Sequence, residues 1–80
     1  MKAKVYVTLK KSVLDPQGKA VRQALETLGF REVGGVRCGK MIEIEFKNGL
    51  PREKAEKELK EMCEKLLANT VIEEYRWEIK

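Results

Sequence analysis

The sequence predicts an α+β domain of two layers, with strands and helices in the order β-α-β-β-α-β. Three observations support this prediction. Segments near both ends and in the middle of the chain alternate apolar and polar side chains, as half-buried strands do. Two segments between them repeat apolar residues at helical spacing. Glycine, proline and asparagine stand where one pattern gives way to the next, which is where turns are expected.

The first strand is expected at residues 4–9 and the first helix directly after the following turn. Asp15 can cap this helix by accepting a hydrogen bond from a backbone N–H of the first turn. Pro16 suits the first helical position, where its missing N–H is no loss. Gly29 can end the helix because it adopts the left-handed conformation without a Cβ penalty. The apolar stripe of the helix comprises Ala20, Val21, Ala24, Leu25 and Leu28.

The middle of the chain predicts a β-hairpin. In residues 30–37, Val33 and Val36 flank a pair of glycines, which suggests a short or bulged strand. Residues 38–39 supply a turn, and residues 41–46 alternate clearly between apolar and polar side chains. Two such runs around a turn indicate paired antiparallel strands.

A second helix and a last strand complete the pattern. The turn at residues 48–51 precedes a helix whose end is expected near Asn69, and residues 71–79 are expected to form the last strand. The buried stripe of the second helix comprises Ala55, Leu59, Met62, Cys63, Leu66 and Leu67.

This order of elements is that of the ferredoxin-like fold. Right-handed crossovers would place both helices on one face of a four-stranded antiparallel sheet, giving a two-layer sandwich. The 80 residues are expected to form a single domain spanning residues 1–80.

Composition argues against several classes of function. The net charge of +4 comes from 17 basic and 13 acidic residues that alternate along the chain, whereas a nucleic-acid binder concentrates its basic residues on one face. No apolar run reaches the length of a membrane span. Neither a signal peptide nor a disulfide framework is visible, so we expect a cytoplasmic protein with no membrane partner.

The reactive side chains do not suggest an active site. The chain contains no histidine, and the spacing of Cys38 and Cys63 matches no metal-binding pattern. Cys63 falls on an apolar helical stripe and is expected in the core, while Cys38 is expected in a turn. Glu43 and Glu45 would lie on the open face of the sheet, solvated or paired with cations. We therefore expect no catalytic, cofactor-binding or metal-binding residue.

The open sheet face is the most informative expected surface. An RNA-recognition domain of this topology stacks bases on aromatic side chains there, but Glu43 and Glu45 would repel phosphate. Tyrosine and methionine are enriched at protein interfaces, which favours a protein contact. Gly18 is a second signal, since glycine inside a helix costs about 1 kcal/mol relative to alanine and suggests that another backbone or a partner approaches closely. The expected interface residues are Tyr6, Gln17, Gly18, Arg37 and Met41.

The chain contains several motifs that are together typical of one family: V-Y-V-T-L-K at 5–10, V-L-D-P-Q-G at 13–18, A-L at 24–25, L-G-F at 28–30, V-R-C-G-K at 36–40, C-E-K-L-L-A-N at 63–69 and V-I-E at 71–73. With these motifs the chain resembles the PurS family, the small subunit of phosphoribosylformylglycinamidine (FGAM) synthase. The resemblance covers the whole chain, and V-L-D-P-Q-G is its most specific part. Two positions depart from the family pattern: Thr70, where proline is expected, and Cys38, where a small or aliphatic residue is usual.

The resemblance implies a function in purine biosynthesis. The enzyme of this family converts formylglycinamide ribonucleotide to formylglycinamidine ribonucleotide with ATP, Mg and glutamine, in the fourth step towards inosine monophosphate. A glutaminase subunit releases ammonia and a large synthetase subunit uses it. The small subunit, a homodimer or tetramer, would bridge the two and assist ammonia transfer. It would bind no cofactor, and it would belong to an ATP-dependent glutamine-hydrolysing C–N ligase without having an active site of its own.

Two other functions remain open at this stage. A regulatory domain of the same topology would bind a small ligand near the first strand-to-helix turn, at residues 15–18, and its melting temperature would rise with that ligand. An RNA-binding domain would show salt-dependent affinity for RNA, and Glu43 and Glu45 already disfavour it.

Overall fold

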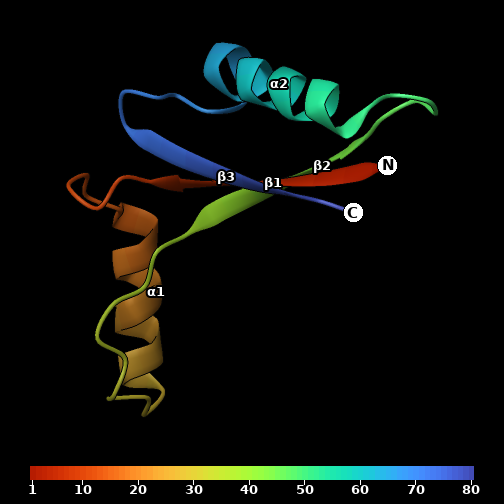
Figure 1. Ribbon diagram of the computed structural model, residues 1–80. Helices are drawn as coiled ribbons and strands as arrows, with labels where there is room; N and C mark the ends of the chain where they lie inside the picture. The colour runs from red at the N-terminus through yellow and green to blue at the C-terminus, as the bar shows by residue number, and fades with distance from the viewer.

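The computed structural model describes residues 1–80 as three strands and three helical segments (Figure 1). They are β1 (Lys2–Leu9), α1 (Pro16–Thr27), β2 (Gly39–Glu45), α2 (Arg52–Met62), η1 (Cys63–Leu67) and β3 (Glu73–Ile79). The segment η1 is a single π-helical turn that continues α2. The expected positions of both helices and of three strands are confirmed to within a few residues.

The three strands form one antiparallel sheet in the order β2-β1-β3. In the middle of the sheet Val5 lies opposite Ile42 of β2 and Trp77 of β3. Because side chains alternate between the two faces of a strand, this register gathers the apolar residues of all three strands on one face. The central strand therefore buries its apolar side completely.

The core lies between that apolar face and the helix above it, α2 with η1 (Figure 1). Its buried side chains come from β1, from α2 and η1, and from the residue after η1. They are Ala3, Val5, Val7, Leu59, Cys63 and Ala68. Burying a valine or leucine side chain of this kind stabilises the fold by about 1.5–3 kcal/mol. The prediction that Cys63 is a core thiol is confirmed, and its burial raises the pKa of the Cys63 thiol.

The expected strand in residues 30–37 is absent, so the prediction of a four-stranded sheet is wrong. Residues 31–38 form no backbone–backbone hydrogen bond, and the chain runs from them directly into β2 without the expected turn at residues 38–39. The prediction that both helices cover one face is wrong as well. In Figure 1 α2 covers one side of the sheet, whereas α1 projects from the end of the sheet on the other side.

Residues 15–38 therefore form an arm, made of α1 and the extended segment that returns beside it (Figure 1). The arm makes the molecule long and thin, with extents of 50 × 25 × 14 Å. The radius of gyration is 16.1 Å, whereas a compact domain of this length has about 12 Å. Only 8 of the 80 residues are buried, which leaves a small core for the chain as a whole.

The substitution Leu59→Ala tests the core between α2 and the sheet. Leu59 has an exposed fraction of 0%, and removing a fully buried leucine side chain lowers the free energy of unfolding by about 2–5 kcal/mol. Urea denaturation measures this loss. The matched control is Leu66→Ala, because Leu66 is 81% exposed and should change stability by no more than about 0.5 kcal/mol. Equal effects of the two substitutions would contradict the assigned core.

Candidate functional site

The five expected interface residues fall on two separate parts of the molecule. Tyr6 and Met41 lie on the sheet face opposite α2, on neighbouring strands. Gln17, Gly18 and Arg37 lie at the base of the arm, where it leaves the sheet. The sequence did not predict that these residues form two separate groups. It placed both helices on the sheet face opposite the one that carries Tyr6 and Met41.

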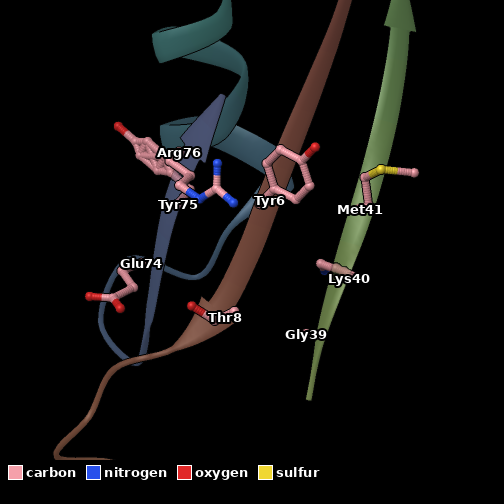
Figure 2. Close-up of a pocket in the computed structure, with 8 residues that line it drawn as sticks. All are labelled: Tyr6, Thr8, Gly39, Lys40, Met41, Glu74, Tyr75 and Arg76. Carbon is pink, nitrogen blue, oxygen red and sulfur yellow. The ribbon is translucent and has the colours of Figure 1, made fainter. Parts of the chain in front are cut away.

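The open sheet face carries a hollow of about 480 Å³ around Tyr6 (Figure 2). Tyr6 lies between Met41 of β2 and Arg76 of β3 in the strand register. The guanidinium carbon of Arg76 is 4.1 Å from the centre of the Tyr6 ring, a distance at which a cation is attracted to the ring face. Thr8 and Glu74 lie at the next level of the sheet and line the same hollow.

The groups of this hollow suit contact with a protein better than catalysis or base stacking. Arg76 already occupies a face of the Tyr6 ring, and its guanidinium also pairs with the Glu78 carboxylate at 3.4 Å. Glu43 and Glu45 lie on the same open face of β2 and are both exposed, whereas the two carboxylates of an acid/base pair lie in different environments. Tyrosine, arginine and methionine are the residue types that anchor protein interfaces.

At the base of the arm, Asp15 ties together two parts of the chain that are distant in sequence. Its Oδ1 accepts a hydrogen bond from the Gly18 N–H at 2.9 Å, and its Oδ2 accepts one from the Cys38 N–H at 2.8 Å. The bond from Gly18, the bond from Cys38 and the positive charge of Arg37 lower the pKa of Asp15. The predicted helix cap is confirmed, but its second bond was not predicted, because nothing near Asp15 in the sequence points to residue 38.

Arg37 and Gly18 complete this connection, which we call the Asp15 latch (Asp15, Gly18, Arg37 and Cys38). The Arg37 guanidinium donates to the backbone carbonyl oxygens of Leu9 and Lys10 at 2.6 and 2.5 Å. A Cβ atom on Gly18 would overlap the carbonyl oxygen of Val36. The prediction that another backbone approaches Gly18 is thus confirmed, and that backbone belongs to the same chain. Contact of the five expected interface residues with a partner stays a prediction.

The structure shows neither a cluster of metal ligands nor a membrane-spanning helix. No three side chains among histidine, cysteine, aspartate and glutamate converge on a point where they could hold a metal ion. None of the helices combines the length and the apolar character needed to cross a bilayer.

The fold and its surfaces thus define a small α+β protein built for contacts with other chains. The family model described as PurS, phosphoribosylformylglycinamidine (FGAM) synthase, matches residues 2–80. The chain therefore belongs to the PurS family of FGAM synthase subunits, which function in purine biosynthesis.

The relatives agree over nearly the whole chain. The PurS subunit of Bacillus subtilis is 55% identical over 82 residues, which cover 98% of this chain and 90% of the relative. The PurS subunit of Archaeoglobus fulgidus is 49% identical over 75 residues, covering 94% and 92%.

Solved structures show the same fold. PurS of Methanocaldococcus jannaschii superposes with a TM-score of 0.86 at 44% identity, covering 99% of this chain and 94% of that one. A chain in the structure of PurLQS from Thermotoga maritima superposes with a TM-score of 0.76 at 32% identity, covering 96% and 93%. The arm and the three-stranded sheet are therefore shared with relatives, one of them within a larger complex.

The latch should open in acid. The pKa of Asp15 is lower in the folded chain than in the unfolded one, so the latch is fully formed above the unfolded pKa of about 3.9. It is lost as the pH falls through the folded value. The hydrogen-exchange protection factor of the Cys38 amide should stay constant from neutral pH to about pH 4 and fall below it.

The substitution Asp15→Asn is the matched control for this titration. Its single amide oxygen can still accept the Gly18 N–H, but its NH₂ group cannot accept the bond from Cys38. Protection of the Cys38 amide should therefore be low at every pH in this variant. A wild-type profile that matches that of Asp15→Asn would show that the latch does not form in solution.

The substitution Gly18→Ala tests the close approach of Val36. The added methyl group would overlap a backbone oxygen that the latch holds in place. This overlap should exceed the gain in helix propensity and lower the free energy of unfolding by about 1–3 kcal/mol. Gly34→Ala is the control, because a Cβ there meets no atom within 4 Å. Urea denaturation compares them, and equal stabilities would refute the contact.

Proposed function

We propose that this PurS-family chain acts as a non-catalytic bridge between the two larger subunits of FGAM synthase. In this role it joins the glutaminase subunit to the ATP-dependent synthetase subunit and assists the transfer of ammonia between them. The observation that carries the proposal is the likeness of the whole chain to a chain of the Thermotoga maritima PurLQS complex. ATP, Mg and glutamine act at the other two subunits, and the complex works in the cytoplasm.

The shape of the chain supports a bridging role. A bridge needs two contact surfaces that are held apart at a fixed separation. The hollow around Tyr6 lies on the sheet, whereas the exposed side of α1 lies on the arm. The longest extent of the molecule is 50 Å. The Asp15 latch connects the two parts through hydrogen bonds to backbone groups. Partners bound at the two surfaces would keep a defined spacing.

The contribution to ammonia transfer follows from that spacing. The chain has no buried polar or charged side chain, so its own core offers no polar path for a small molecule. Its part in the transfer is to align the two larger subunits so that ammonia passes directly between their sites. We further propose that the subunit self-associates as a dimer or a tetramer.

The alternative, a stand-alone domain that binds a small regulatory ligand at residues 15–18, has less support. Both oxygens of the Asp15 carboxylate already accept backbone hydrogen bonds from Gly18 and Cys38. A ligand at this turn would have to break the latch in order to use that carboxylate.

Reconstitution tests the bridging role. The large and glutaminase subunits are mixed with and without this chain, and glutamine-dependent formation of FGAM is measured together with the mass of the complex. Activity and a stable complex should appear only when the chain is present. Activity with high concentrations of ammonium in place of glutamine should depend on it far less, because ammonia then reaches the synthetase from solution. Equal assembly and glutamine-dependent turnover without the chain would overturn the proposal.

A matched pair of variants sharpens this experiment. Tyr6→Ala combined with Arg76→Ala removes the stacked pair at the centre of the hollow and should lower glutamine-dependent activity at least tenfold at limiting concentrations. Lys54→Ala changes an exposed residue of α2, on the opposite side of the sheet, and should leave activity unchanged. If both variants behave alike, the hollow is not a contact surface for the larger subunits.

A further inference from the structure

The positive charge of the chain is concentrated at the base of the arm. The two segments that join the arm to the sheet, residues 10–19 and 37–40, hold five basic residues and a single acidic one, Asp15. Their charge of +4 equals the net charge of the whole chain. The chain has 17 basic and 13 acidic residues, so the rest of it holds equal numbers of each sign. We call the five basic residues the basic patch: Lys10, Lys11, Lys19, Arg37 and Lys40.

Hydrogen bonds hold the two segments side by side, so the charges of the basic patch act together. The Cys38 N–H donates to Asp15, and the Arg37 guanidinium donates to the carbonyl oxygens of Leu9 and Lys10. Every residue of the patch either takes part in these contacts or lies within four residues of one that does. Because the Debye length is about 8 Å at physiological ionic strength, salt does not fully screen such neighbours from one another.

No carboxylate of the chain neutralises the basic patch. Both oxygens of Asp15 accept backbone N–H groups, and every ion pair of the chain lies elsewhere. Two acidic residues begin β3 beside the patch. Glu73 accepts the Asn69 N–H at 2.7 Å, and Glu74 lines the hollow around Tyr6 (Figure 2). The side chains of the patch are exposed apart from a half-buried Lys10, so their repulsion is relieved when an acidic surface covers them.

Exposed apolar side chains border the basic patch. Leu14 belongs to the segment that leads into α1 and is 72% exposed. Val71 is 79% exposed and Ile72 is 40% exposed. The Ile72 carbonyl accepts the Lys10 N–H at 2.9 Å, so these residues adjoin the patch. A nucleic acid would engage the cations through its phosphates, whereas a protein interface combines an apolar centre with a polar rim. The apolar residues therefore favour a protein as the partner.

We propose that the basic patch docks on an acidic surface of one larger subunit of FGAM synthase, with Leu14 and Val71 in the same contact. The inference deepens the proposed function and rests on it, since it states the chemistry of the partner that binds at the arm. That partner presents carboxylates around an apolar area. Opposite charge speeds the encounter and excludes partners of like charge. The hollow around Tyr6 lies outside the basic patch, apart from Lys40, which lines it. The two contact surfaces of the bridge therefore recognise different chemistry.

Fluorescence titration of the labelled full-length chain tests the inference. The dissociation constant is measured for the synthetase subunit, for the glutaminase subunit and for the two together. Lys11→Glu combined with Lys19→Glu reverses two exposed charges that take no part in the latch, and it should raise the dissociation constant for one larger subunit at least tenfold. Lys47→Glu combined with Lys80→Glu is the matched control, with the same change in net charge at the opposite end of the sheet. It should leave the dissociation constants unchanged, and circular dichroism should be the same for all three proteins.

Conservative variants and salt show whether charge itself is responsible. Lys11→Arg combined with Lys19→Arg keeps both charges and should bind as the wild type does. The affinity of the wild type should fall as sodium chloride is raised, because the Debye length shortens from about 10 Å at 0.1 M to about 3 Å at 1 M. The fall should be smaller for Lys11→Glu combined with Lys19→Glu. Equal dissociation constants for the charge-reversed variant and its matched control, with each larger subunit and with both together, would overturn the proposal.

The outcomes separate this inference from the proposed function. If reconstituted FGAM synthesis depends on the chain and the charge-reversed variant binds as its control does, the docking at the basic patch is wrong while the bridging role stands. If the reversal weakens binding but synthesis does not depend on the chain, the docking stands and the bridging role fails. A labelled single-stranded RNA is the remaining probe. Binding to it that is tighter than to either larger subunit, and that the reversal abolishes, would assign the patch to nucleic acid and overturn the proposal.

Discussion

A single carboxylate sets the direction of the arm, and the rest of the structure depends on that direction. The two oxygens of Asp15 accept the N–H groups of Gly18 and Cys38, so the chain leaving the sheet and the chain returning to it are joined at one point. Hydrogen bonds to a charged acceptor are about twice as strong as those between neutral groups. Arg37 reinforces the junction by donating to the carbonyls of Leu9 and Lys10. The segment that leads from the sheet to α1 and the segment that returns to the sheet are therefore both fixed at the base of the arm.

The fixed arm explains why the sheet has three strands and one covering helix. A ferredoxin-like fold would place residues 33–37 beside the free edge of β2, with α1 over the apolar face next to α2. Here that face is covered by α2 and η1 alone, so Ile42, Ile44 and Trp77 remain half-buried. The apolar surface that a closed fold would bury within one chain stays outside, on the sheet and on α1. A chain with so small a core gains further buried area by associating with other chains.

The sequence predicted both helices and three of the four expected strands well, and its errors concern how these elements are assembled. Asp15, Pro16 and Gly29 mark the ends of α1 because capping acts within one helical turn, and such signals are visible in the sequence. The prediction of a strand in residues 30–37 was wrong because a strand needs a partner to pair with. The hydrogen bond between Asp15 and Cys38, 23 residues apart, decides where this segment lies and therefore which partner it can reach. For the same reason, Gly18 predicted that another backbone segment approaches closely, but it did not identify which segment that is. The stacking of Arg76 on Tyr6 was not predicted, since it depends on two strands from opposite ends of the chain.

The groups that the structure does place fit the proposed role of holding other subunits in position. Three groups have a shifted pKa, and each has a place in the fold: Asp15 holds the latch, the Cys63 thiol lies in the core, and Tyr75 packs against that core. The charges of the open face are arranged in opposite pairs across the strands, with Lys4 between Glu43 and Glu78 in the register. Such a face adds little net field, so under the proposed function it would select partners by shape and by its central Tyr6–Arg76 pair. In the proposed bridge, specificity would then arise from the distance and angle between the two surfaces. Both quantities are fixed by the latch, so its hydrogen bonds matter to the complex as much as the contact residues do.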